Sequence, residues 1–357
     1  MRRRAQGKVS LKILAGILGV VLTCLLLSTV FFRWNLTGPG PLLTPRFSLR
    51  EFFAEIPSHL DWLLVFILLS GSLIPLRALQ WGRTLPKKVP FKERYHLVAI
   101  GAFTHNALPG KLGDFIRAFL MSRSQKIPFV CSLGSVAVCK LLEFAALILL
   151  AALSLVGLGE ILDEFGGALQ GAALLCLGLV VLVVMLAHFA GRIAAWLHAK
   201  HRFPKFQVIL VEVGEGLGSA RSFRGLAVAF LFSIPPVVAN AAAYGSGLAG
   251  MGLKGGFWAG ALILGAIALG QSTPGIPVGM GVYYFVTSWM ARKLGASAEE
   301  AAVYATLTHL STLFTQISIG AVSVWMRRIG WRELIRRSRK AKEEVHHVAE
   351  EIEEAPA

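Results

Sequence analysis

Two pairs of oppositely charged residues stand one helical turn apart in stretches that are otherwise apolar. Asp114 and Arg117 lie in "LPGKLGDFIRAFL", and Lys140 and Glu143 lie in "SLGSVAVCKLLEF". Residues at this spacing share one face of a helix. A charge inside a bilayer costs at least about 2.5 kcal/mol unless it is paired or hydrated, so we expect these side chains to face the protein interior. The chemistry they offer is recognition of an anionic head group by Arg117 and Lys140.

Each pair has two interpretations. Either Arg117 binds a phosphate and Asp114 restrains it when no ligand is present, or the two form an interfacial ion pair at the end of a hairpin. Lys140 and Glu143 either line a pathway or neutralise each other and so fix helix packing. We favour the pathway for Lys140 and Glu143, because ionisable groups within membranes mark functional sites.

Proline and glycine interrupt the apolar sequence twice, first in "LPGKLG" and then in "STPGIPVGMGVYYF". Irregular backbone survives in a bilayer only where protein or a water-filled cavity satisfies its polar groups. Free amides at the start of the short helix after the first interruption would also favour anions. We therefore expect the substrate-binding residues to come from the two interruptions and the charged pairs: Asn106, Pro109, Gly110, Lys111, Gly113, Asp114, Arg117, Lys140, Glu143, Pro277, Gly279, Gly281 and Tyr284. Tyr283 is expected to be a packing residue.

The elements that must position these residues are membrane helices. Hydrophobic residues make up 55% of the 357 positions and charged residues only 16%, a balance typical of integral membrane proteins. Segments 95–122 and 256–293 are broken and predicted to enter and leave on one side as re-entrant hairpins. The prediction is an all-α integral membrane protein with six full crossings, at about 9–32, 60–80, 133–157, 169–190, 225–248 and 301–325.

The two halves of the chain repeat. A shift of about 165 residues lays a first repeat, about 8–157, over a second, about 169–326, and "PGKLG" falls on "PVGMG". Because each half has three crossings, the second half is predicted to be inverted, as in many secondary transporters. We expect one membrane domain over 1–326 and a charged cytoplasmic tail over 327–357.

Charge distribution sets the orientation and the partners. The net charge is +16, and the bases lie between apolar segments rather than on a compact face with aromatic platforms, which argues against nucleic acid. They concentrate in the N-terminal arm, in 81–132, in 191–224 and after 326, which predicts that both termini are cytoplasmic. Anionic lipid head groups are the expected partners.

No enzyme motif stands out in the sequence. It lacks a phosphate-binding Walker loop, a zinc-protease His-Glu pair and a nucleophile elbow. The four cysteines are scattered, without metal-ligand spacing. We expect neither catalysis nor a metal or other cofactor.

The motifs "FTHNALPGKLGDFIRAFLMSRSQKIPF", "VAVCKLLEF" and "PVGMGVYYF" together resemble the lysylphosphatidylglycerol synthase transmembrane region, the flippase-like domain family. The likeness covers nearly the whole chain and implies a bacterial or archaeal inner-membrane protein that translocates a lipid or a lipid-linked sugar. Three positions depart from the family pattern: Val278 replaces a glycine, Tyr284 a glutamate and Cys139 an acidic residue. The aminoacyl-transfer domain of full synthases has no counterpart after residue 326, so we do not expect the chain to make lysyl-lipid.

The function expected from these observations is flippase-like translocation of an anionic lipid or a polyprenyl-phosphate-linked lipid. The alternative is a non-transporting membrane scaffold, or an accessory subunit of a lipid-modifying transferase, which would then be a further partner.

Overall fold

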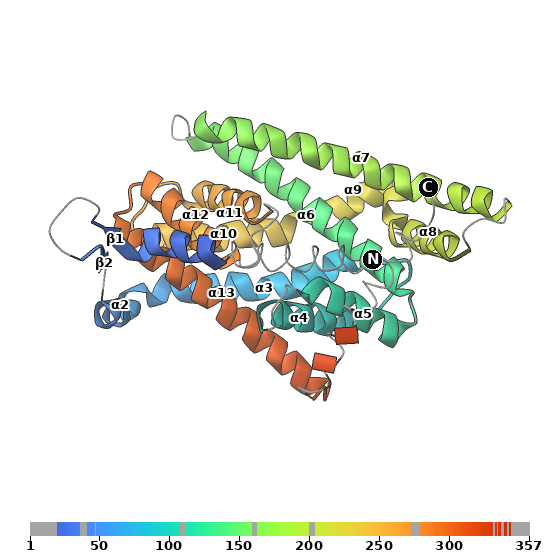
Figure 1. The fold of residues 1–357 in the computed structure, drawn as a ribbon, viewed down its shortest axis with the longest axis horizontal. Coiled ribbons are helices and arrows are strands. Elements are labelled where there is room, and N and C mark those ends of the chain that lie inside the picture. The colour runs from blue at the N-terminus through green and yellow to red at the C-terminus, as the bar shows by residue number, and fades with distance from the viewer. Residues whose placement is uncertain are drawn as a thin grey trace, which may run out of the picture. The chain divides into compact units, whose positions relative to one another are not determined.

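The computed structural model describes residues 20–35, 41–46, 48–107, 112–158, 163–199, 204–272 and 279–330, and positions 333, 335, 336, 339, 340 and 343. The chain divides into two compact units (Figure 1). Unit 1 holds residues 1–69, 150–166 and 240–312, and unit 2 holds residues 70–149, 167–239 and 313–357. Neither unit coincides with one of the sequence repeats, since each takes residues from both halves of the chain.

Several long helices contribute residues to both units. These are α3 (Leu60–Trp81), α6 (Phe129–Leu158), α7 (Asp163–Ala199), α10 (Ile234–Gly250) and α13 (Ala298–Met326).

Within unit 1, a helix over Val20–Phe31 leads into an antiparallel ribbon of β1 (Phe32–Trp34) and β2 (Leu43–Pro45), with Arg33 opposite Thr44. The other elements of unit 1 are α2 (Leu49–Glu55), the 3-10 turn η1 (Ile56–His59), α11 (Gly256–Ser272) and α12 (Gly279–Lys293). The all-α prediction did not include this short ribbon. Its aromatic and β-branched residues favour extended backbone.

The core of unit 1 is built from aromatic and small residues. Trp62 and Tyr304 lie with ring centroids 6.4 Å apart, and both are buried. An added Cβ at Gly247 would lie 2.8 Å from the Tyr304 ring, so glycine allows α10 to approach α13 closely.

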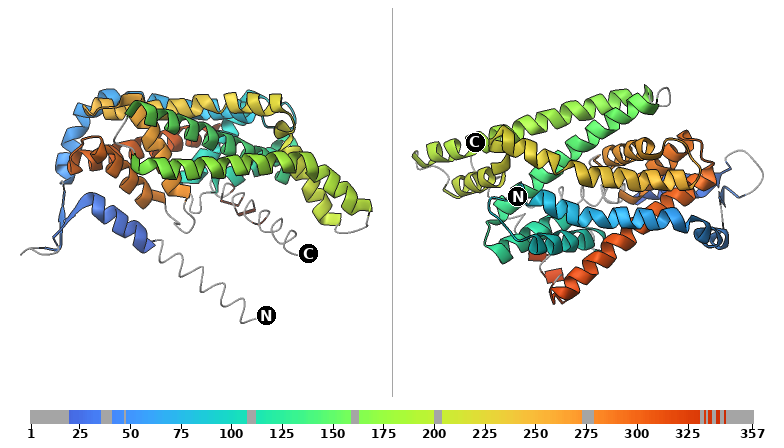
Figure 2. Two further views of the ribbon diagram at one scale, coloured as in Figure 1. Left: turned by 90° about the horizontal axis from the view of Figure 1, so that it is seen from above. Right: turned by 180° about the vertical axis from the view of Figure 1, so that it is seen from behind.

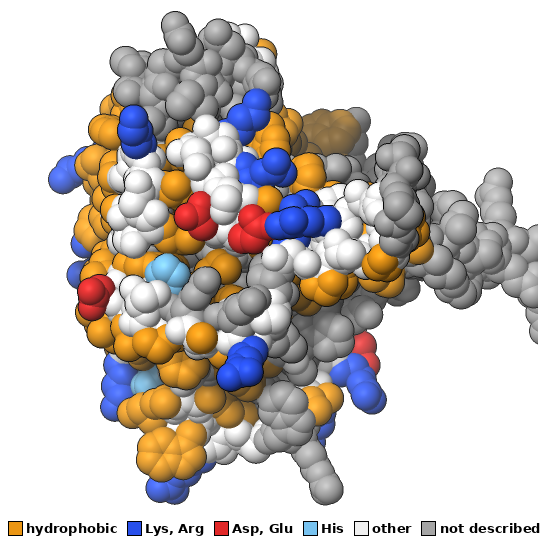
Figure 3. Space-filling view, turned by 90° about the vertical axis from the view of Figure 1, so that its left-hand side faces the viewer, with side chains coloured by type: hydrophobic (Ala, Val, Ile, Leu, Met, Phe, Trp, Pro, Cys, Tyr) orange, Lys and Arg blue, Asp and Glu red, His pale blue; other side chains and the backbone are white. Residues whose placement is uncertain are grey.

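On the face drawn in Figure 3, hydrophobic side chains cover much of the surface, and acidic and basic side chains lie beside one another near its centre.

Unit 2 contains α4 (Phe91–Ala107), α5 (Gly113–Gln125), α8 (Pro204–Gly216), the 3-10 turn η3 (Gly218–Arg221) and α9 (Phe223–Leu231). Its largest cluster of buried apolar residues surrounds Trp81, Ile100, Ile116 and Met121. A smaller cluster joins α6 to α7 through Val138, and these two helices lie side by side in both Figure 1 and Figure 2.

Five described helical segments are long and apolar enough to cross a membrane: Ile56–Trp81, Phe129–Ser154, Gln170–Leu197, Phe223–Gly250 and Ala298–Met326. In Gln170–Leu197 only 17% of the apolar window is buried. A helix with so much exposed apolar surface requires lipid around it. These segments overlap five of the six predicted crossings. The sixth, 9–32, is described only from residue 20, where a shorter apolar helix runs over Val20–Phe31.

The crossing expected over 225–248 is not one continuous helix. It consists of α9 and α10, with a turn at Phe232 and Ser233. Pro235 and Pro236 follow at once, and a proline inside a helix removes a backbone donor and clashes with the carbonyl four residues earlier. The break therefore falls where the prolines require it.

Both segments predicted to be broken consist of two helices that pack against each other, α4 with α5 and α11 with α12. In the first hairpin, an added Cβ at Gly113 would overlap the Gly101 carbonyl oxygen, so the two glycines allow backbone contact. In the second, an added Cβ at Gly270 would lie 2.7 Å from a methyl of Val282. The residues between the helices, 108–111 and 273–278, lie outside the described part of the chain.

Candidate functional site

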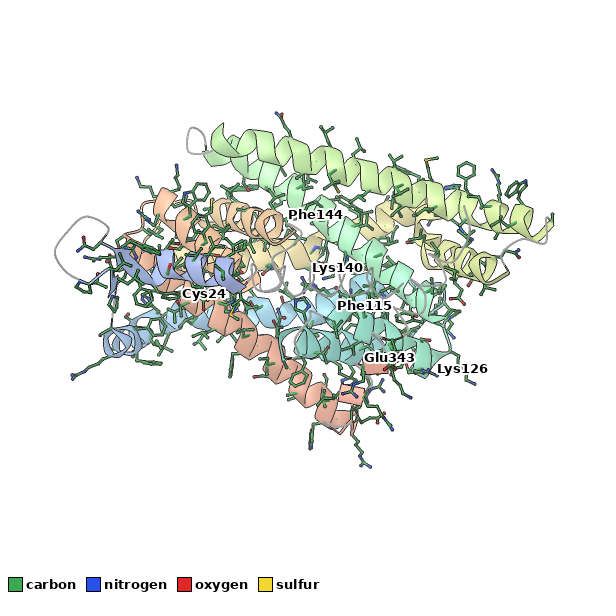
Figure 4. The ribbon with its side chains drawn as sticks, in the orientation of Figure 1. Cys24, Phe115, Lys126, Lys140, Phe144 and Glu343 are labelled. Carbon is green, nitrogen blue, oxygen red and sulfur yellow. The ribbon has the colours of Figure 1, made fainter. Side chains whose placement is uncertain are left out.

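A cluster of charged side chains lies in unit 2 on α3, α5 and α6. The Asp114 carboxylate faces two cations: its Oδ1 lies 3.0 Å from Arg117 Nη2, and its Oδ2 lies 3.7 Å from Lys140 Nζ. Lys140 is labelled midway along α6 in Figure 4. The structure thus brings the two sequence-predicted pairs together through Asp114. We call these residues, together with Arg77 and Glu143, the charged cluster.

Lys140 and Glu143 are not paired with each other. Glu143 Oε1 lies 3.4 Å from Arg77 Nε on α3, close enough for an ion pair although not aligned as a hydrogen bond. Each charge of α6 therefore has its partner on a different helix. Mutual neutralisation, one of the two interpretations of this pair, is not the arrangement found.

Arg77 is a member of the cluster that the sequence analysis did not single out. It lies in "IPLRALQW", inside the predicted second crossing. Like Lys140, Arg77 is a charged residue within an apolar span, so the same sequence feature indicates both residues. Three cations, Arg77, Arg117 and Lys140, therefore stand against two carboxylates, which leaves the cluster positive overall.

Arg117 is the buried cation of the cluster. Its side chain is only 6% exposed, and its Cζ lies 5.2 Å from the centroid of the Trp81 ring, within range of a cation–π interaction. Trp81 is held in turn by a 2.9 Å hydrogen bond from its Nε1 to Ser135 Oγ. Within the described chain, Arg117 Nε has no hydrogen-bond partner. A buried donor without a partner is uncommon in folded proteins, which makes Arg117 Nε a candidate ligand contact.

Lys140 is the accessible cation. Its side chain is 46% exposed, although it lies about 16 Å along the apolar span that starts at Phe129. An ammonium at that depth cannot face hydrocarbon without a large cost, so its exposed part must face water or a polar head group.

Asp114 is ionised in this setting. Burial alone would raise the pKa of its carboxyl, but Arg117, then Lys140, His105 and Arg77, act in the other direction and hold the pKa below its usual value. The carboxylate therefore remains a fixed anion between two cations.

Two other predicted residues of this region have structural contacts. Asn106 Nδ2 donates to Gln316 Oε1 of α13 at 2.7 Å and to Ala102 O at 2.8 Å, so it joins α4 to α13. Gly113 was expected to let a head group approach the backbone. Its described contact is with α4, where an added Cβ would also lie 2.7 Å from His105 Cβ.

The predicted residues of the second hairpin belong to unit 1. Gly279 begins α12, and an added Cβ at Gly281 would lie 2.8 Å from Thr23 Cα, so this glycine permits close packing on the first helix. Tyr284 is buried, with its ring centroid 5.3 Å from that of Phe31 and 5.2 Å from that of His309. The remaining predicted positions, Pro109, Gly110, Lys111 and Pro277, lie outside the described residues.

Tyr283 makes hydrogen bonds that the sequence analysis did not anticipate. Its hydroxyl donates to Thr308 Oγ1 at 2.9 Å and accepts from Tyr244 at 3.1 Å. The Tyr304 hydroxyl donates to Tyr244 O at 2.8 Å. A neutral hydroxyl network thus occupies the end of the second hairpin in unit 1. Thr308 is the residue that lies 168 positions after Lys140, the same offset that aligns "PGKLG" with "PVGMG" in the predicted repeat.

Among the described residues, no group of three or more His, Cys, Asp or Glu side chains is arranged to hold a metal ion. The side chains of the charged cluster offer ionic recognition and hydrogen bonding.

The apolar helices long enough to span a bilayer define a multi-pass α-helical membrane protein. The family model described as "Lysylphosphatidylglycerol synthase TM region" matches residues 16–320, and the chain belongs to that family. This membership confirms the resemblance seen in the sequence and indicates a function related to membrane lipids. Searches of curated proteins and of solved structures found no match.

Proposed function

We propose that the chain is a flippase-like transporter that moves an anionic lipid, or a polyprenyl-phosphate-linked lipid, across the bacterial or archaeal inner membrane. The observation that carries the proposal is Lys140, a half-exposed ammonium midway along an apolar span. Family membership supports a lipid as the substrate.

In the proposed mechanism, the head group exchanges with Asp114. A phosphate that reaches Lys140 competes with the carboxylate 3.7 Å away, and the unpartnered Arg117 Nε supplies a buried donor. Asp114 keeps both cations paired when no lipid is bound, which lowers the cost of holding them within the membrane. The Arg77–Glu143 pair fixes α6 against α3 and so sets the position of Lys140.

The proposed topology has six crossings and two re-entrant hairpins related as an inverted repeat, with both termini cytoplasmic. The paired helices of each hairpin support this arrangement. No step of the proposed mechanism makes or breaks a covalent bond, so the chain is proposed not to be an enzyme.

A translocation assay tests the proposal. The purified chain is reconstituted in liposomes with a fluorescent phosphatidylglycerol, and an impermeant quencher reports the exposed leaflet. We expect faster translocation than in protein-free liposomes, and loss of that gain in Lys140→Gln. Lys254→Gln, a lysine outside the cluster, should behave as wild type. Equal rates with and without the protein would contradict transport of this lipid class.

A further inference from the structure

A cleft of about 560 Å³ opens in unit 2 between α4, α5 and the segment that follows α13. Five basic side chains line it: Arg123, Arg327, Arg328, Arg336 and Lys340. Glu333 is the acidic residue of the lining. The cleft shares no residue with the charged cluster, so it is a separate candidate site.

Two of the five cations are neutralised and three are not. Arg327 forms an ion pair with Glu93, and Arg336 forms one with Glu333. Throughout the described ranges, no carboxylate pairs with Arg123, Arg328 or Lys340. The cleft therefore has an excess of positive charge that attracts an anion.

The cleft also has an apolar part. Leu97, Phe119, Leu120 and Ile329 line it beside the cations, and Leu97 and Phe119 are buried members of the large apolar cluster of unit 2. The Arg123 guanidinium carbon lies 5.2 Å from the centroid of the Phe119 ring, which orients this arginine over the apolar wall. Cations beside an apolar wall suit an amphiphile better than a bare ion.

The backbone at Arg328 supports a functional role for its side chain. Arg328 has φ = 52°, in the left-handed region. Its N–H donates to Trp325 O at 2.9 Å, and the N–H of Ile329 donates to Val324 O at 3.1 Å, which is the Schellman arrangement at the end of α13. Glycine is the usual residue at this position, and arginine is disfavoured there. The chain thus places a guanidinium at the cleft despite a backbone cost.

We propose that this cleft binds the phosphate group of an anionic amphiphile, at a site distinct from the charged cluster. Arg123, Arg328 and Lys340 contact the phosphate, and the Leu97–Phe119 wall contacts the apolar substituent. The phosphate belongs to a membrane lipid, and preference for a soluble phosphate ester would contradict the proposal. The proposal does not depend on transport by the chain.

The Arg328→Gly variant provides a sharp test. Glycine adopts the left-handed conformation at no steric cost, so the variant removes the guanidinium while preserving the helix end. The matched control is Lys126→Gly. Lys126, labelled in Figure 4, caps α5 with φ = 53° and does not line the cleft, so the control makes the same loss of charge at the same kind of backbone position.

Binding of dihexanoyl phosphatidic acid to the full chain in detergent is measured by calorimetry, with glycerol phosphate as the soluble ligand. We expect Arg328→Gly to weaken phosphatidic acid binding roughly tenfold or more, and Lys126→Gly to leave it nearly unchanged. Tighter binding of phosphatidic acid than of glycerol phosphate would support a lipid ligand, and equal binding would contradict contact with the apolar wall.

An unchanged affinity in Arg328→Gly, or an equal loss in Lys126→Gly, would overturn the proposal. The thermal midpoint of Arg328→Gly should be no lower than that of wild type. If that variant does not fold, Arg328→Asn, which also tolerates the left-handed region, replaces it and must show the same loss.

Discussion

Glu143 of α6 lies 3.4 Å from Arg77 of α3, and not beside Lys140, its neighbour one turn away on the same helix. This arrangement separates the two charges of α6. Glu143 forms an ion pair with Arg77 of α3. Lys140 forms one with Asp114 of α5, and nearly half of the Lys140 side chain is exposed. The proposed mechanism depends on this division, because only an accessible cation can receive a head group.

Glu143→Gln should destabilise the protein by about 1–3 kcal/mol, because it leaves the mostly buried Arg77 without an anionic partner. Thermal unfolding of the purified protein in detergent measures the effect. The double variant Arg77→Gln/Glu143→Gln should recover part of the loss. Glu215→Gln, at an exposed residue of α8, is the control and should have little effect. Strictly additive losses would show that the two residues do not interact.

Gly113→Ala should destabilise the first hairpin by about 1–3 kcal/mol, because the added methyl would overlap the Gly101 carbonyl oxygen. Gly178→Ala on α7 is the matched control, since an added Cβ there meets nothing within 4 Å. The control should be neutral or slightly stabilising. The measurement is the thermal midpoint of each variant, and equal midpoints would mean that α4 and α5 do not touch at Gly113.

Tyr283→Phe should lower the stability of unit 1 by about 0.5–1.5 kcal/mol, because the buried hydroxyls of Tyr244 and Thr308 each lose a hydrogen-bond partner. Tyr95→Phe removes the hydroxyl of a partly buried tyrosine of α4 and is the control. Hydrogen exchange of α12 and α13 amides should increase in the first variant alone. Unchanged exchange would contradict the proposed role of the network.

Transport should not show a titration of Asp114 between about pH 5 and pH 8, because the pKa of this carboxyl lies below its usual value of about 3.9. The ion pairs to Arg117 and Lys140 are present at and above that range, and they are lost only as the pH falls through the lowered pKa. Asp114→Asn should therefore reduce the translocation rate by the same factor at every pH tested. A difference confined to one end of the range would show that Asp114 changes protonation state there.

The sequence predicted the elements better than the partners. Hydropathy placed the long apolar helices α3, α6, α7 and α13 to within a few residues, except that α7 extends further, because apolar length is a property of each segment alone. Proline and glycine likewise marked the two hairpins. Hydropathy and spacing do not predict the ion-pair partners of Lys140 and Glu143. Their spacing fits an ion pair between the two residues on one helix as well as separate ion pairs with two other helices.

Two further differences have separate causes. The predicted crossing over 225–248 contains Pro235 and Pro236, which lie where α9 ends and α10 begins. The two prolines therefore indicate the break in the sequence itself. The link from Asn106 to Gln316 joins residues far apart in the chain, and neither hydropathy nor spacing reports such a contact.

Access of water to position 140 is required for a head group to reach the charged cluster. In a background lacking Cys24, Cys131, Cys139 and Cys176, a single cysteine replaces Lys140, and a charged, membrane-impermeant thiol reagent is added to sealed vesicles. A cysteine at Leu149, an exposed apolar position of the same helix, is the lipid-facing control. We predict that position 140 is labelled and that position 149 is not labelled. Complete protection of position 140 from both sides of the membrane would contradict a polar path to the charged cluster.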